Sequence, residues 1–189
     1  MISAVGTRAW WRLRSRLQSF ARDRRGVSAV EFSAVLPFML IAYLGSVEVG
    51  NGIAIKLRVT MTARTVSDLA TQYFTIANAD MASIMSASTA VMAPYSAVPL
   101  VITLSEVTTD ASGKGTITWS DSLNGSPRPV GQSVTLPAQL QTPNISLIWA
   151  EVKYGYTPNL GYVMTGTLTL SDQVWMYPRL ANYVTRVNS

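Results

Sequence analysis

The chain has 189 residues, of which 48% are hydrophobic and 13% are charged, about half the charged fraction of an average soluble protein. It is long enough for one modest domain and a membrane anchor, and too short for two large domains. Cysteine and histidine are both absent, which excludes disulfides, His/Cys zinc sites and imidazole acid–base chemistry.

The basic residues are concentrated at the N-terminus. Residues 1–26 contain seven arginines and one aspartate and carry a net charge of +6, whereas the remainder has eight basic and nine acidic residues. Because a nucleic-acid-binding domain keeps its basic surface on the folded part, we expect no nucleic-acid partner. The segment is predicted to be a cytoplasmic leader, either disordered or lying as an amphipathic helix on membrane lipid.

An uncharged apolar segment follows the leader. It covers residues 32–47 and is flanked by Glu31 and Glu48. A helix counted from Val27 to Val47 rises about 31 Å, close to the roughly 30 Å of a hydrocarbon core. We therefore predict a transmembrane helix within residues 27–55, with Glu48 marking its outer interface. The arginines orient the N-terminus toward the cytoplasm, so the chain after Glu48 is expected in the periplasm.

Residues 56–94 are predicted to be a periplasmic helical region. Apolar residues recur every three or four positions and form one stripe, which predicts a helix continuing to about Ala79. The stripe consists of Val59, Ala63, Val66, Ala70, Tyr73 and Ala77. Asn78 or Asp80 is the expected start of a second, shorter helix that ends by Pro94.

Residues 95–189 are predicted to form a β-sheet domain. "PLVITLSEV" and "GTITWSD" flank a turn-rich segment and indicate a hairpin, and "ISLIWAEVKYGY" and "YVMTGTLTLSDQVWMY" indicate two more strands. The expected fold class is α+β. It combines a long N-terminal transmembrane-to-periplasmic helix, a short second helix and a small antiparallel sheet of about four strands packed on the helix.

The junction between leader and apolar segment carries a recognisable motif. Gly26 is followed by four residues and then Glu31, after a basic arm and before an apolar helix containing Pro37. This arrangement resembles the processing site of type IV pilin-like proteins. The wider sequence resembles the TadE/TadG-like family of Tad (Flp) pilus assembly proteins, through "RRGVSAVEFSAVLPFMLIAYLGSVEVGNG", "ARTVSDLATQ", "VKYGYTP" and "WMYPR".

The resemblance implies a minor pilin or pseudopilin that acts in pilus assembly, adhesion or secretion and is not an enzyme. A prepilin peptidase would cut between Gly26 and Val27, which makes Glu31 the fifth residue of the mature chain. In a helical stack, the Glu31 carboxylate of one subunit would pair with the new α-amine of its neighbour, since each group is costly to bury alone. Other implied partners are pilin-like subunits and inner-membrane platform proteins; no cofactor or metal is implied.

Two further features of the apolar helix concern its packing. Pro37 removes a backbone hydrogen bond, so it acts either as a functional bend or as an inert kink. Small residues at every fourth position form a ridge that favours close approach of helices in a membrane, although the chain is also rich in such residues. The ridge consists of Ala42, Ser46, Gly50 and Ala54.

Two other functions compete with this interpretation. One is a permanently anchored periplasmic adaptor of the pilus machine that is never cleaved. The other is a membrane-tethered hydrolase, for which a Ser–Lys pair would be needed, yet none of the three lysines follows an S-x-x-K spacing. Glu106, Asp110 and Asp121 flank the first hairpin without a metal-ligand spacing, so we expect them to be turn acids.

Overall fold

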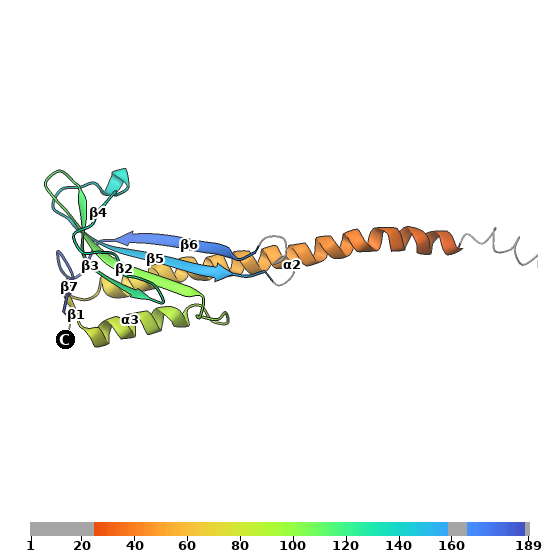
Figure 1. The fold of residues 1–189 in the computed structure, drawn as a ribbon, viewed down its shortest axis with the longest axis horizontal. Helices are drawn as coiled ribbons and strands as arrows, with labels where there is room; N and C mark the ends of the chain where they lie inside the picture. The colour runs from red at the N-terminus through yellow and green to blue at the C-terminus, as the bar shows by residue number, and fades with distance from the viewer. Residues whose placement is uncertain (1–24, 159–165, 188–189) are drawn as a thin grey trace, which may run out of the picture. The chain divides into compact units, whose positions relative to one another are not determined.

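The computed structural model describes residues 25–158 and 166–187 and confirms the α+β class (Figure 1). The leader, apart from its last two residues, lies outside the described residues. The chain divides into two compact units, Met1–Val47 and Glu48–Ser189. One helix, α2 (Arg25–Ala70), contributes to both units, and all the other described elements belong to the second.

Helix α2 ends earlier than the apolar stripe predicts. The prediction that it reaches Ala79 is wrong, since the helix stops at Ala70 and the chain enters a short strand, β1 (Thr75–Ile76). There the backbone is held by the C-terminal segment. Thr71 accepts a hydrogen bond from the Arg179 N–H at 3.0 Å, and β1 pairs in parallel with β7 (Thr185–Arg186).

The second helix, α3, covers Asn78–Ala90. Asp80 lies in its first turn, and its carboxylate accepts a hydrogen bond from the Ala77 N–H at 3.0 Å, which satisfies a donor that the helix start would otherwise leave free. The helix begins at Asn78, one of the two predicted positions, but Ala77 and not Asn78 or Asp80 is its N-cap residue, and the helix ends four residues before Pro94.

The central sheet has five strands in the order β4-β3-β2-β5-β6, all antiparallel. The four predicted strands are its long members: β2 (Leu100–Thr109), β3 (Gly115–Leu123), β5 (Ser146–Tyr156) and β6 (Leu168–Met176). The expected count of about four is corrected by β4 (Ser133–Val134) and by the separate β1–β7 pair. Two-residue strands are too short to show an alternating pattern. A 3-10 turn, η1, covers Ala138–Leu140.

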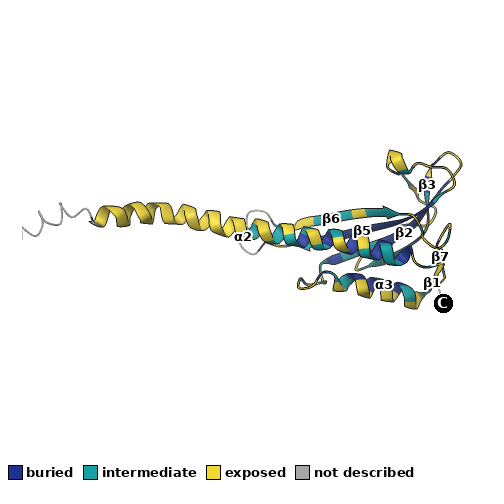
Figure 2. Cartoon of the chain, turned by 180° about the vertical axis from the view of Figure 1, so that it is seen from behind, coloured by how far each residue is buried: buried dark blue, intermediate teal, exposed yellow. Residues whose placement is uncertain are grey.

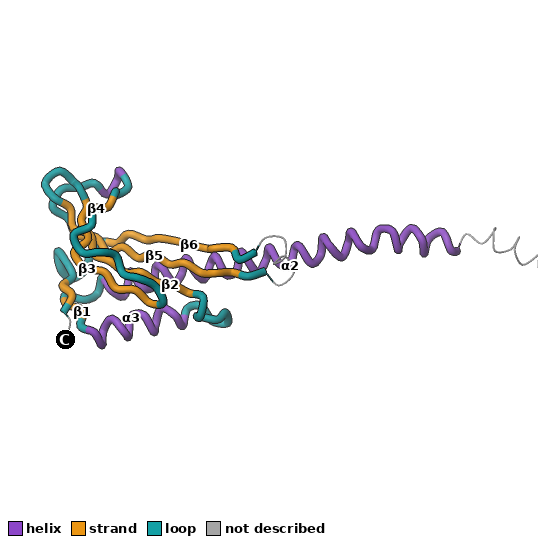
Figure 3. The backbone as a smooth tube through the Cα atoms, viewed as in Figure 1, coloured by secondary structure: helices purple, strands orange, loops and turns teal. Residues whose placement is uncertain are grey.

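The main core lies between the sheet and two helices (Figure 3). The stripe predicted on the long helix faces inward, because Val59, Ala63, Val66 and Ala70 are fully buried. In Figure 2 this part of α2 and α3 lie alongside the sheet and carry buried residues, in dark blue. A smaller cluster lies on the outer face of the sheet and is closed by residues of the β4–η1 segment; it consists of Val107, Ile117, Leu136, Leu147 and Trp149.

The edge of the sheet at β6 is protected by α2. Lys56 donates a hydrogen bond to the Ser171 carbonyl and forms an ion pair with Asp172 at 3.5 Å, and Thr60 also bonds to the Asp172 carboxylate. Burial raises the pKa of Asp172, but these bonds and a hydrogen bond from the Gln173 N–H outweigh burial, and the pKa of Asp172 is lowered. A charged cap on an edge strand discourages the addition of another strand.

A buried carboxylate holds the C-terminal segment against the sheet. Glu106 accepts hydrogen bonds through the same oxygen from the Val184 N–H and the Ser146 hydroxyl, each at 2.7 Å. The Trp119 indole N–H donates to the Val184 carbonyl at 2.7 Å. Burial raises the pKa of Glu106. This arrangement, the Glu106 clamp, fixes Val184 through both of its backbone groups.

Candidate functional site

The first residues of α2 are the predicted processing site. Gly26 and Val27 are both exposed and already helical. A Cβ atom added to Gly26 would meet no atom within 4 Å, so the fold itself does not require glycine there. Glycine weakens a helix by roughly 0.8–1.0 kcal/mol relative to alanine, which favours local unwinding at this bond. The structure therefore offers an accessible peptide bond in a weakened helical turn.

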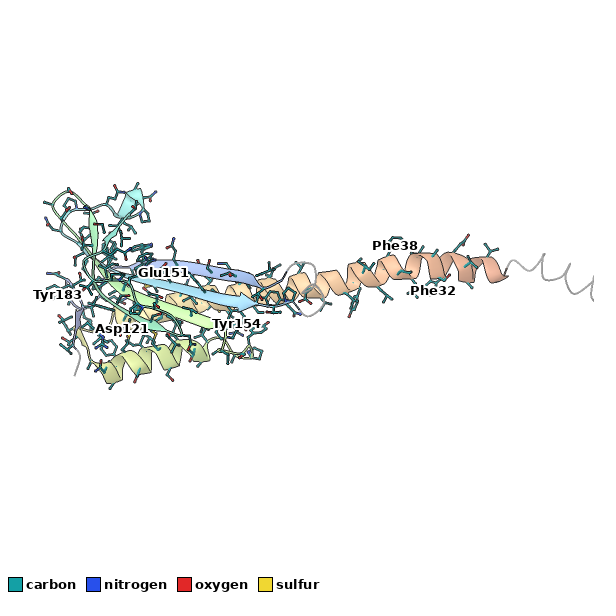
Figure 4. The ribbon with its side chains drawn as sticks, in the orientation of Figure 1. Phe32, Phe38, Asp121, Glu151, Tyr154 and Tyr183 are labelled. Atoms are coloured by element: carbon teal, nitrogen blue, oxygen red, sulfur yellow. The ribbon has the colours of Figure 1, made fainter. Side chains whose placement is uncertain are left out.

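Glu31 lies one helical turn beyond Val27, on the same face of α2. It is exposed and makes no hydrogen bond or ion pair with the side chains that the structure describes. The side chains around it are exposed and apolar, and Figure 4 shows Phe32 and Phe38 projecting from the helix surface. Among the described residues, Glu31 is thus an unpaired acid close to the exposed apolar side chains of Val27 and Val35.

The apolar part of α2 is long enough to cross a membrane. An 18-residue window within Gly26–Ala70 is apolar enough for a membrane span, and none of it is buried. The chain therefore carries a candidate membrane anchor near its N-terminus. The helical assignment continues through Pro37, and its bending role stays a prediction.

The small-residue ridge is partly accessible. Ala42, Ser46 and Gly50 are exposed, whereas Ala54 is half-buried. A Cβ atom on Gly50 would meet nothing within 4 Å, so no neighbouring atom of the described chain requires a glycine there. The ridge is available for contact with another helix over its first three positions.

The structure reveals an apolar surface that our sequence analysis did not identify. Beyond Glu48, α2 exposes four large apolar side chains at every fourth position, opposite the buried stripe. We call them the outer stripe; they are Val49, Ile53, Leu57 and Met61, and between 50% and 63% of each residue is exposed. The i, i+4 spacing was visible in the sequence, but a buried stripe of similar spacing on the same helix obscured it.

Glu48 has a specific partner in the folded domain. Its carboxylate accepts a hydrogen bond from the Tyr156 hydroxyl at 2.6 Å, where β5 meets α2. Burial and then the bond to Glu48 raise the pKa of Tyr156 to about 12. The predicted boundary marker is therefore also the first residue of α2 that bonds to the sheet.

Replacing Tyr156 by phenylalanine should lower the free energy of unfolding by about 1–3 kcal/mol, because it leaves Glu48 without this donor. Since the folded pKa is raised, the bond stabilises the wild-type protein below the ordinary tyrosine pKa of 10.0 and is lost as the pH rises through about 12. Thermal unfolding measured between pH 7 and pH 12 checks this. A variant as stable as the wild type at pH 7 would contradict it.

The expectation that the three acids near the first hairpin are turn acids is wrong for Glu106 and Asp121, which lie within β2 and β3, and holds for Asp110. Each of the three has separate partners. Asp110 accepts bonds from the Ser112 hydroxyl and from the Ser112 and Lys114 N–H groups, and the Ser112 hydroxyl is the main cause of its lowered pKa. Asp121 pairs with Arg186 at 2.8 Å, and Glu106 forms the clamp. Among the described residues, no group of three potential metal ligands converges.

A family model described as TadE-like protein matches residues 26–68. The resemblance that the motif around Gly26 indicated is thus confirmed over this segment, which includes Gly26, Glu31 and Pro37 and most of α2. The match covers 43 of the 189 residues of the chain. No curated protein and no solved structure matches the chain.

Proposed function

We propose that this TadE-like protein is a minor pilin or pseudopilin of a Tad pilus. It is made as a membrane precursor, processed between Gly26 and Val27 by a prepilin peptidase, and assembled with other pilin-like subunits on inner-membrane platform proteins. Its N-terminus faces the cytoplasm and its sheet domain faces the periplasm. It has no catalytic role of its own.

The outer stripe is the observation that carries this proposal. A helix that only anchors a domain needs apolar side chains within the bilayer and a polar outward surface beyond it. Here, the apolar surface continues past Glu48 for more than three further turns. Side chains of this size in this pattern are expected to be covered, and another helix is the partner that the i, i+4 spacing fits.

Removal of the leader completes the argument. Arginines are very costly to move through hydrocarbon, so the intact leader holds α2 in the membrane. Cleavage removes seven arginines and creates an α-amine one helical turn from Glu31. The loss of the arginines and the new α-amine therefore both favour the transfer of α2 from lipid to a stack of helices.

Intact-mass analysis of the protein from its native host tests the proposal. Cleavage predicts a mature chain that begins at Val27 in cells with an active prepilin peptidase, and a full-length chain when the peptidase gene is deleted. A full-length chain in both strains would instead support the uncleaved periplasmic adaptor.

Replacing Glu31 by alanine should leave cleavage intact and strongly reduce piliation. Loss of one partner from a buried ion pair destabilises by about 3–5 kcal/mol, because the remaining charge is left uncompensated. Immunoblots distinguish precursor from mature chain, and electron microscopy counts pili in the same cells. Glu31→Gln separates charge from size and should fail in the same way. Wild-type piliation in both variants would refute the docking role.

Replacing Leu57 by aspartate should impair assembly without unfolding the protein. Leu57 is 56% exposed in the chain alone. Substitutions at exposed positions usually change stability little, so the variant should melt at nearly the wild-type temperature. If the outer stripe is covered in the pilus, the buried carboxylate should exclude the variant from it. Ala87→Asp on the exposed side of α3 is the matched control. Equal incorporation of both variants into pili would contradict the proposed packing.

A further inference from the structure

A pocket lies where the end of β5 meets α2 and the segment between α3 and β2. It has a volume of about 460 Å³, and its lining includes Asn51 and Ile55 of α2, Tyr95, and Tyr154 and Tyr156 of β5, of which Tyr154 is labelled in Figure 4. Sites for small ligands have volumes of roughly 300–1,000 Å³. This pocket, which we call the tyrosine pocket, is therefore large enough to hold one.

Two of the three tyrosines in this pocket have hydroxyl groups without a partner. Tyr154 and Tyr156 are more than nine-tenths buried, and Tyr95 is half-buried. Burial, together with the neighbouring Tyr95, raises the pKa of Tyr154, so its hydroxyl stays protonated. Within the described part of the chain, the hydroxyls of Tyr95 and Tyr154 form no hydrogen bond. Because polar groups of buried side chains are usually hydrogen-bonded, the Tyr154 hydroxyl in particular points to a ligand.

The charges around the pocket favour a cation. Tyr156 donates a hydrogen bond to the Glu48 carboxylate at 2.6 Å, and the described lining residues include no lysine or arginine. A carboxylate and tyrosine rings attract a positive charge, whereas they disfavour a phosphate or a carboxylate. An ammonium group also supplies N–H donors for the tyrosine oxygens. The chemistry of the pocket therefore selects an ammonium group.

The place of the pocket in the chain identifies the source of this ammonium group. Asn51 lies four residues after Val47, the last residue of the predicted span, on the same continuous helix. Four helical residues rise about 6 Å. The headgroup region extends roughly 5–8 Å beyond the hydrocarbon core on each side. The lining therefore begins at the depth of the phospholipid headgroups, where tyrosine is enriched in membrane proteins.

We propose that the tyrosine pocket binds the ammonium group of a phospholipid headgroup, in the periplasmic leaflet of the membrane that α2 spans. The ammonium N–H groups donate to the hydroxyls of Tyr95 and Tyr154, and the Glu48 carboxylate balances the charge. Since Tyr154 is fixed in the core, binding requires little ordering of side chains. The site holds the sheet domain at the lipid surface. It rests on membrane anchoring by α2, and it does not depend on cleavage after Gly26 or on piliation.

The test uses the full chain in nanodiscs that contain equal amounts of phosphatidylethanolamine, its N-acetylated form and phosphatidylglycerol. Acetylation removes the ammonium charge and keeps the rest of the headgroup. Native mass spectrometry of the released protein identifies the lipid that it retains, and phosphatidylethanolamine should be preferred about fivefold or more over each of the other two. Equal retention of the three lipids, or retention of none, would overturn the proposal.

Two further outcomes separate the source of the ligand from the anchor. Soluble glycerophosphoethanolamine carries the same ammonium group without acyl chains. If it displaced the lipid at equal concentration, the ligand would be a free amine and the assignment to lipid would be wrong. Co-elution of the chain with the nanodisc is measured first, because a chain that failed to insert would refute the anchor and this site with it.

Two variants locate the interaction. Tyr154→Phe removes only a hydroxyl that has no partner in the described chain, so it should melt at the wild-type temperature or above and lose preference for phosphatidylethanolamine. Tyr95→Leu should reduce this preference by about fivefold, because it removes both a hydroxyl and an aromatic ring. Tyr183→Leu is the matched control, since Tyr183 is 61% exposed and lies outside the pocket. Wild-type preference in both pocket variants, or an equal loss in Tyr183→Leu, would overturn the proposal.

Discussion

Replacement of Gly26 by leucine is expected to block removal of the leader, so that cells accumulate the precursor. The leucine side chain finds open space in the chain itself, because a Cβ atom at this position meets no atom within 4 Å. The effect must therefore arise in the peptidase, whose subsite has to accept the residue before the cut. A steric penalty of about 3 kcal/mol there would slow cleavage by more than about a hundredfold. Leucine also strengthens the helix that has to unwind.

Gly45 provides the matched control for this experiment. It lies on the same helix, and a Cβ atom there also meets nothing within 4 Å. Gly45→Leu should therefore be inserted and cleaved at the wild-type rate, as followed by pulse-chase labelling and immunoblotting. If Gly26→Leu were processed as fast as Gly45→Leu, the cut would lie elsewhere, and the assignment of Val27 as the mature N-terminus would be wrong.

The elements with long and regular patterns were predictable from the sequence. The stripe that contains Val59 and Val66 repeats with the period of a helix and proves to be fully buried, and the alternation in "LVITLSEV" and "LIWAEVKYGY" corresponds to β2 and β5. The motif around Gly26 could also be recognised from the sequence, because glycine, acid, proline and arginines occur together. Local sequence determines these features, so local patterns reveal them.

The remaining features depend on contacts between distant parts of the chain. Helix α2 stops at Ala70 although its apolar stripe continues, because the C-terminal segment supplies Arg179 to bond at Thr71 and β7 to pair with β1. The bond between Glu48 and Tyr156 joins residues 108 positions apart. The pairing of β3 with β4 at Gly115 and Thr116 depends on the place where β4 lies. No periodic pattern records such pairings, which explains why the sequence analysis did not identify them.

Replacement of Glu106 by alanine should have the largest effect on the stability of the sheet domain. It removes the acceptor of both the Val184 N–H and the Ser146 hydroxyl, and each unsatisfied buried group costs about 1–3 kcal/mol. The cavity left by the side chain adds to this cost, and we expect a total loss of about 3–5 kcal/mol in the free energy of unfolding. Because Val184 is held by this clamp, the C-terminal segment should lose protection from hydrogen exchange first.

Glutamine at position 106 separates the clamp from its charge. It keeps a carbonyl oxygen for both donors and removes the buried carboxylate, so Glu106→Gln should be at least as stable as the wild type at neutral pH. Since the folded pKa of Glu106 is raised above its ordinary 4.5, the protonated form stabilises the wild-type protein below pH 4.5, and this contribution is lost as the pH rises through the folded pKa. Thermal unfolding from pH 4 upward should therefore show a decline in the wild type that Glu106→Gln lacks.

Glu151 is the control for this pH dependence, because its carboxylate is half-buried and paired with Arg128 at 2.7 Å. Glu151→Gln should cost no more than about 1 kcal/mol, as expected for a partly exposed ion pair, and should keep the wild-type decline. If Glu106→Gln were as destabilised as Glu106→Ala at neutral pH, the carboxylate charge itself would be needed to hold Val184. A wild-type protein whose stability rose with pH over this range would show that hydrogen bonding to Glu106 outweighs its desolvation.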